Sequence, residues 1–282
     1  MAVTPTSPEP APQPALPLVF AHRGSSEALP EHTLAAYLRA ISEGADGLEC
    51  DVRLTRDGHL ICVHDRRLNR TSDGRGVISR RDLAQLEELD FGSWHPGWPA
   101  SADELITDRE DRIDTPRTPV LTFNRLLSTT VDAGRHLRLL VETKHPSRFG
   151  SEVEDKVVDA LAAYGLHEPK PDHSVLATVM SFSALAVRRM RDRAPKLETV
   201  WLTEFATPGL RDGRVPFGAK IAGPSVRVVK SNPEIVERLH DNGNKIYVWT
   251  VNHPDDMDLL IGLGVDGIIS DRPRAVLDRL GR

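Results

Sequence analysis

The stretch "LVFAHRGSSEALPEHTLAAYLRAISEG", residues 18–44, decides the fold. It opens with four apolar residues, which suit a buried strand, passes through a polar segment, and continues with apolar residues at helical spacing. The polar segment begins with His22 and Arg23, directly after the strand. The folded part of the chain is therefore expected to start near Leu18 with a strand and a covering helix.

The same alternation recurs along the chain. Runs with the length and composition of strands occupy residues 18–21, 47–55, 59–65, 137–144, 175–182, 198–204, 219–226, 245–252 and 266–270. Amphipathic helical runs follow several of them, at residues 32–44, 151–165, 183–194, 254–264 and 272–280.

Alternating strands and helices predict an α/β fold whose parallel strands are covered by helices on both faces. A closed barrel and an open doubly wound sheet both fit this pattern. A glycine-rich GxGxxG turn after the first strand would favour the open sheet, and the sequence has none there. The number of units favours the closed form, so we predict a TIM (β/α)8 barrel.

Composition excludes some functions. The 282 residues suit one large domain or two small ones. The 36 basic and 41 acidic residues give a net charge of -5, and no dense stripe of lysine and arginine offers a track for a nucleic-acid backbone. We therefore expect a small-molecule substrate and no nucleic-acid partner, while the sequence sets no oligomeric state.

The sequence also predicts the location of the protein and the redox state of its two cysteines. No apolar run has the length of a membrane-spanning helix, and the N-terminus lacks the basic start and apolar block of a secretory signal. We predict a cytoplasmic protein without stable membrane insertion. Residues 1–17 are rich in proline and are predicted to form a disordered leader before the folded domain. Cys50 and Cys62 are too few for a disulfide framework and are expected to remain thiols.

The segment "GLECDVRLTRDGHLICVHD", residues 47–65, departs from the alternation because a short turn joins its two strand-like runs. Such a connection predicts an antiparallel hairpin. With Arg56 and Asp57 as the turn, Glu49 would face His64 and Asp51 would face Cys62; a glycine bulge would shift this register by one residue. Either register brings His64 close to the two carboxylates.

Residues 66–118 interrupt the repeat and predict an insertion in the barrel domain of residues 18–282. Its acidic part, Asp103 to Asp114, is interpreted as a solvated surface without a metal role. Phe91, Trp94 and Trp98 in "FGSWHPGWP" could either line an apolar groove or dock the insertion onto the barrel.

Ionisable residues gather at four predicted strand ends: His22-Arg23, Glu49 with Asp51, His64-Asp65, and Glu142 with Lys144. Residues two apart on a strand point to the same face, and the carboxyl ends of barrel strands meet at one mouth. Each group alone suits a structural histidine or a surface ion pair, but together they predict an active site.

Three carboxylates in one site would repel one another unless a cation lay among them. Oxygen ligands favour calcium or magnesium, with manganese possible, over zinc. The two histidines could act as general acid and general base. The arginine, the lysine and the cation would together stabilise an anion, for which phosphate is the obvious candidate.

With these residues assembled, the chain resembles the glycerophosphodiester phosphodiesterase family along nearly its whole length after the leader. The resemblance is carried, in order, by "AHRGSSEALPEHT", "GADGLECDVRLTRDGHLICVHDRRLNRTSDG", "DFGSWHPGW", "TPVLTFNRLL", "LLVETKH", "VMSF", "VWTVN" and "GVDGIISDRP". It implies a TIM barrel with a family-specific insertion. It also implies metal-dependent hydrolysis of glycerophosphodiesters, such as glycerophosphocholine or glycerophosphoethanolamine, to sn-glycerol 3-phosphate and an alcohol.

The resemblance also implies a role for each site residue. Glu49, Asp51 and Glu142 look like the ligands of one divalent cation. His22 and His64 look like the acid and base pair. Arg23 and Lys144 look like phosphate contacts, with Arg23 counted also among the catalytic residues. Trp249 in "VWTVN" looks like a wall of the substrate pocket. A tryptophan buried in the core would fit the same sequence pattern.

The motif "PEHT" departs from the family, which usually has asparagine where this chain has His32. His32 or Thr33 could cap the first helix, and a histidine there could also reach the mouth. Glu31 is left with a structural or supporting role.

The sequence leaves open which histidine is the base. It also leaves open whether water attacks or the substrate's glycerol hydroxyl does so to give a cyclic intermediate. The alternative function is a lysophospholipase D-like activity on lysophospholipids, which an apolar groove in the insertion would favour.

Overall fold

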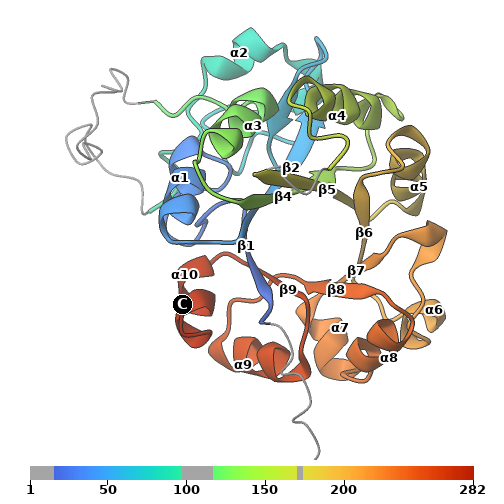
Figure 1. The fold of residues 1–282 in the computed structure, drawn as a ribbon. Helices are drawn as coiled ribbons and strands as arrows, with labels where there is room; N and C mark the ends of the chain where they lie inside the picture. Colours follow the sequence, from blue (N-terminus) through green and yellow to red (C-terminus); the bar gives the residue numbers. More distant parts are fainter. Residues whose placement is uncertain (1–15, 97–116, 170–173) are drawn as a thin grey trace, which may run out of the picture.

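Parallel strands form a closed ring in the computed structural model, which describes residues 16–96, 117–169 and 174–282 (Figure 1). Within these residues the ring closes where β1 pairs with both β9 and β2. In order around the ring, the strands are β1 (Leu18–His22), β2 (Gly47–Leu54), β4 (Leu137–Thr143), β5 (Val175–Ser181), β6 (Glu198–Thr203), β7 (Ile221–Pro224), β8 (Lys245–Val248) and β9 (Gly267–Ser270). The predicted TIM barrel is confirmed.

Helices surround the ring of strands (Figure 1). They are α1 (Leu34–Ser42), α2 (Leu83–Glu87), α3 (Phe123–Val131), α4 (Glu152–Ala163), α5 (Ala184–Arg193), α6 (Pro208–Arg211), α7 (Val226–Ser231), α8 (Ile235–Asp241), α9 (Pro254–Leu263) and α10 (Pro273–Arg279). The five predicted helical runs correspond to α1, α4, α5, α9 and α10. Among the described residues, no helix is both long and apolar enough to cross a lipid bilayer.

Side-chain alternation on β2 explains why two carboxylates enter the barrel. Leu48, Cys50 and Val52 point outward and pack in an apolar cluster with residues of α1, α3 and α4. Because successive side chains of a strand point to opposite faces, Glu49 and Asp51 point inward. A second apolar cluster, with Phe20, Leu140 and Tyr247 among its members, fills the barrel.

The predicted hairpin forms between β2 and β3 (Leu60–Cys62), but the register with a two-residue turn is wrong. Val52 pairs with Cys62, which is the register shifted by one residue. The physical reason is Gly58, whose positive φ of 82° adds a third residue to the loop. Cys62 and Cys50 remain buried thiols, as predicted.

The described part of the insertion packs on β3 and contains α2 and a short 3-10 helix, Ile78–Arg80. Apolar side chains of the insertion form one buried cluster with Ile61 of β3 and with Val63 and Val120, which flank the insertion. The members from the insertion are Leu68, Ile78, Leu86 and Phe91. Phe91 therefore docks the insertion rather than lining a groove. Trp98, the acidic stretch from Asp103 to Asp114 and residues 1–15 lie outside the described residues.

Candidate active site

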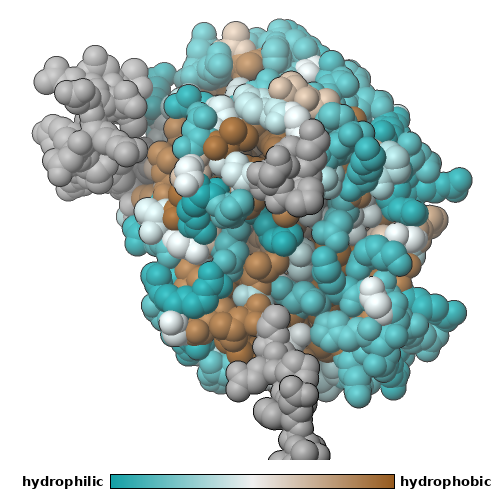
Figure 2. Space-filling view, in the orientation of Figure 1, coloured by the Kyte–Doolittle hydropathy of each residue, from teal (hydrophilic) through white to brown (hydrophobic). Residues whose placement is uncertain are grey.

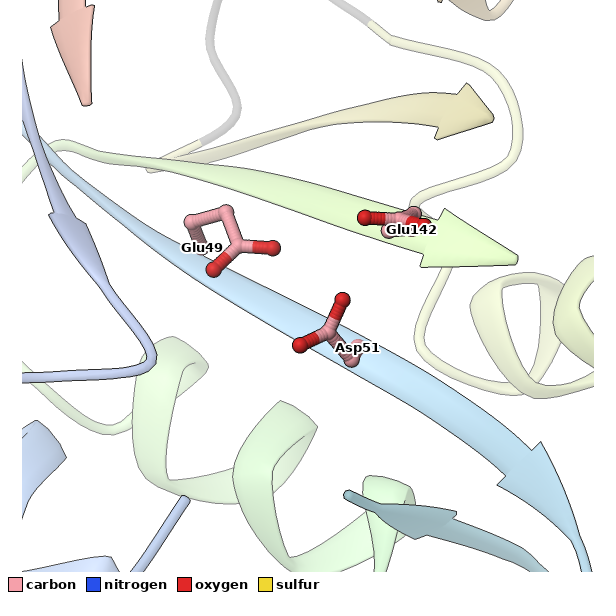
Figure 3. A group of neighbouring side chains, drawn as sticks. All are labelled: Glu49, Asp51 and Glu142. Atoms are coloured by element: carbon pink, nitrogen blue, oxygen red, sulfur yellow. The ribbon is translucent and has the colours of Figure 1, made fainter. Parts of the chain in front are cut away.

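Three buried carboxylates meet at the carboxyl ends of β2 and β4. Asp51 is the pairing partner of Glu142 on the neighbouring strand, and Glu49 lies two residues earlier on the same face of β2. Figure 3 shows the three side chains on these two strands, facing a common space. One oxygen from each lies within 4.8 Å of the others, which is close enough for all three to contact one cation.

Two cations compensate this cluster only in part. Lys144 Nζ lies 2.7 Å from Glu142 Oε1 and 3.2 Å from Asp51 Oδ1, and Arg23 Nε lies 3.1 Å from Asp51 Oδ2. Burial acts to raise the pKa of Asp51, but Lys144, Arg23 and His32 outweigh it and hold that pKa well below its usual range.

The other two carboxyls behave in the opposite way. Burial, reinforced by the charge of Asp51, raises the pKa of Glu49 well above its usual range. Burial and Asp51 also raise the pKa of Glu142, to about 8, against the lowering effect of Lys144. The cluster therefore lacks positive charge for three ionised carboxylates at neutral pH. An oxygen-only donor set with this deficit fits a hard divalent cation.

His22, at the end of β1, is oriented by a carboxylate from the other end of the chain. Its Nδ1–H donates to Asp271 Oδ1 at 2.6 Å, and its Nε2 lies 4.0 Å from Glu49 Oε2. Asp271 also accepts from Ser26 Oγ at 2.8 Å and from Asn252 Nδ2 at 2.5 Å. Burial acts to raise the pKa of Asp271, but these donors lower it to about 2, so the partner of His22 is ionised.

His64 follows β3 and has a comparable partner. Its Nδ1–H donates to Asp65 Oδ1 at 2.8 Å, while Asp65 also accepts from Arg70 Nε at 2.8 Å. Burial, together with the charges of Arg23 and Lys144, lowers the pKa of His64 to about 4. His64 is therefore neutral at pH 7, with Nδ1–H committed to Asp65 and Nε2 left as an acceptor.

Glu31 connects the two sides of the site. It accepts from Arg23 Nη1 at 3.0 Å and from Arg70 Nη1 at 2.7 Å, so the supporting role expected of it takes the form of a bridge between two arginines. Arg23 Nε is buried and faces Asp51 Oδ2 at 3.1 Å as an ion pair, although the two atoms do not meet hydrogen-bond geometry.

His32 reaches the carboxylate cluster instead of capping α1. Thr33 caps that helix by accepting from Ala36 N. His32 Nε2–H donates to Asp51 Oδ2 at 3.0 Å, and its Nδ1 lies 2.8 Å from the Tyr37 hydroxyl. Burial lowers the pKa of His32, so it supports Asp51 as a neutral donor.

Trp249 lies at the end of β8 and is partly exposed. Its Nε1–H donates to the Gly223 carbonyl oxygen at 2.7 Å, and its ring meets that of Phe182 edge to face at 5.1 Å. Phe182 in turn lies 5.8 Å from Lys144 Nζ. Trp249 thus belongs to an aromatic edge that adjoins the charged cluster, and it is no fully buried core residue.

Sequence reasoning missed Asp271, with its supports Ser26 and Asn252, and also Arg70. Asp271 directly follows the last strand, so the rule that identified the other strand-end groups applied to it as well. Arg70 had no comparable signal, because its place depends on how the insertion folds back over Glu31.

The fold and the site together define a class, that of barrel enzymes whose catalytic groups lie at the carboxyl ends of the strands. The model of the glycerophosphoryl diester phosphodiesterase family matches residues 22–275. The chain therefore belongs to this family and is an enzyme, a phosphodiesterase.

Individual relatives agree with the family match. The chain is 45% identical over 257 residues to "Probable glycerophosphodiester phosphodiesterase 1" of Mycobacterium tuberculosis, covering 91% of this chain and 90% of that protein. It is 31% identical to the glycerophosphodiester phosphodiesterase of Caldanaerobacter subterraneus subsp. tengcongensis, covering 93% and 96%.

Solved structures show the same fold. An Oleispira antarctica phosphodiesterase in complex with the product sn-glycerol-3-phosphate has a TM-score of 0.77 at 24% identity and covers 95% of this chain and 98% of that chain. A putative glycerophosphoryl diester phosphodiesterase from Silicibacter pomeroyi has a TM-score of 0.75 at 23% identity, covering 95% of both chains.

Proposed function

We propose that the chain hydrolyses glycerophosphodiesters to sn-glycerol 3-phosphate and an alcohol, with His22 and His64 as the acid and base pair. The observation that carries the proposal is the convergence of two carboxylate-backed histidines, a carboxylate triad and two cations at one mouth. The names of the relatives and the product bound to the Oleispira antarctica phosphodiesterase support the substrate class.

Glu49, Asp51 and Glu142 would hold one divalent cation, with calcium, magnesium and manganese as the candidates. When bound, this cation would act as a Lewis acid and stabilise negative charge on a phosphate oxygen. Arg23 and Lys144 would bind the remaining phosphate oxygens. Together these groups would hold the phosphate at the mouth that His22 and His64 share.

We infer the roles of the two histidines from their surroundings. His64, neutral at pH 7, takes the proton of the attacking oxygen at Nε2. His22 donates a proton from Nε2 to the leaving alcohol, and the Asp271 carboxylate stabilises its imidazolium form.

The cytoplasmic location stays a prediction from the sequence.

Release of sn-glycerol 3-phosphate tests this function. Glycerophosphodiesters with choline, ethanolamine, glycerol and inositol headgroups are incubated with the protein, with EDTA, and with EDTA followed by each cation. We expect release that EDTA abolishes and one of the three cations restores. Release that persists unchanged in EDTA contradicts the metal site, and no release from any headgroup with cation supplied contradicts the substrate class.

Exposed apolar side chains favour lysophospholipids as a second candidate substrate. Phe182 follows β5 with 42% of its surface exposed, and Phe205 follows β6 with 74% exposed. These residues, rather than the insertion, would contact an acyl chain at the mouth. Choline release from lysophosphatidylcholine, and its loss in a Phe182→Ser and Phe205→Ser double variant that still cleaves glycerophosphocholine, tests this alternative.

A further inference from the structure

A hollow lined by arginines lies on the insertion, outside the active site. Its volume is about 430 Å³. Arg56 from the β2–β3 turn and Gln85 from α2 form part of its wall, and the remaining lining residues are Arg67, Arg75, Gly76, Val77, Arg80 and Arg81. The lining includes no acidic residue, no aromatic residue and no residue of the carboxylate triad or the histidine pair.

Most of these guanidinium groups have no acidic partner among the described residues. Arg56 is paired with Asp82. In the part of the chain that the structure describes, Arg67, Arg75, Arg80 and Arg81 form no ion pair, and all four side chains are exposed. The chain as a whole carries a net charge of -5, so the hollow is a local concentration of positive charge on an acidic protein.

Backbone contacts fix the walls of the hollow. Arg67 pairs with Val77 in an antiparallel bridge, and Arg56 N donates to the Arg81 carbonyl oxygen at 2.7 Å. The five arginines are spread along residues 56–81, and these contacts bring them around one space. Like charges held together in this way repel one another, and an anion between them would relieve that repulsion.

We propose that this hollow binds a compact, multiply charged phosphate, such as pyrophosphate or the di- or triphosphate group of a larger molecule. The planar guanidinium fork matches phosphate oxygens in paired hydrogen bonds. The concave shape favours a compact ligand over a flat membrane surface. The lack of aromatic side chains in the lining gives no platform on which nucleic-acid bases could stack.

Calorimetric titration of the full chain with inorganic pyrophosphate, at low salt and without added divalent cation, tests the proposal. Arg75→Ala with Arg80→Ala is the test variant, and Arg188→Ala with Arg227→Ala, on exposed helical positions far along the chain, is the control with the same loss of charge. We expect the test variant to bind about a hundredfold more weakly, since each charge-assisted contact contributes about tenfold, while the control binds as the unaltered protein does.

The outcomes separate the possible ligands. Binding of pyrophosphate or tripolyphosphate, but not of phosphatidylglycerol vesicles, supports the compact ligand. Equal binding by the test and control variants overturns the site. Loss of vesicle binding in the test variant, with no pyrophosphate binding by the unaltered protein, overturns the compact ligand and assigns the arginines to a membrane surface. Circular dichroism and unchanged phosphodiester hydrolysis verify that the test variant is folded.

Discussion

Each of the two histidines at the mouth donates to a carboxylate, but only one of these carboxylates is paired with a cation in the described part of the chain. On the β1–β9 side, His22 donates to Asp271, which is held otherwise by the neutral donors Ser26 and Asn252. On the hairpin side, His64 donates to Asp65, whose charge is shared with Arg70. At His64, burial and the charges of Arg23 and Lys144 outweigh Asp65 and lower the pKa to about 4, so the carboxylate behind this histidine does not by itself set its proton affinity.

Removing either imidazole is the largest expected perturbation. His22→Ala and His64→Ala should each lower kcat by about a thousandfold, because general acid and base catalysis contributes on this scale. The double variant should lose little more, since the two groups act as a unit. Steady-state release of sn-glycerol 3-phosphate measures the effect, with His59→Ala at an exposed position as the control. Near-normal rates in both single variants would exclude the acid and base roles.

Replacing the two partner carboxylates tests the comparison directly. Asp271→Asn should lower kcat by about a hundredfold with little change in KM, because the full charge of Asp271 acts on His22. Asp65→Asn should cost about tenfold or less, because Arg70 already cancels much of the charge of Asp65. Partial recovery in Asp271→Glu would show that the charge matters beyond the fold. Equal losses in the two asparagine variants would break the distinction between the regions.

These residues also mark how far sequence reasoning extends. The barrel, the strand ends and the triad of Glu49, Asp51 and Glu142 were predictable, because strand periodicity and the common direction of barrel strands place such groups together. The hairpin register was not, since one glycine decides between a two-residue and a three-residue loop. The contact of Arg70 with Glu31 depends on the folded path of an insertion that has no repeating pattern.

The acid limb of the pH profile reports the protonation of His64. His64 must be neutral to act as base, so kcat/KM should be retained at neutral pH and fall as the pH drops through the His64 pKa of about 4. Arg70→Gln leaves the Asp65 charge uncompensated, which stabilises the His64 imidazolium and raises that pKa. The acid limb should then move upward by about 1 in pH. An unmoved limb in Arg70→Gln would show that Arg70 does not control His64.

The smallest expected effect concerns how each histidine is held in place. His22 ends a barrel strand, whereas the position of His64 depends on the loop register set by Gly58. Gly58→Ala should lower the free energy of unfolding by about 1 kcal/mol, because alanine is strained at a positive φ. It should also lower kcat severalfold, because a loop that relaxes toward the two-residue form displaces His64.

Gly165→Ala is the matched control for this last comparison. Gly165 has a φ of 70°, lies beyond the end of α4, and has nothing within 4 Å of an added Cβ, so alanine there should lower stability by a similar amount. Because the segment around Gly165 contains no residue of the candidate active site, kcat should remain unchanged. Urea unfolding and steady-state rates of the two variants provide both measurements. A similar loss of kcat in both would attribute the Gly58 effect to general destabilisation, and a loss confined to Gly58→Ala would attribute it to the placement of His64.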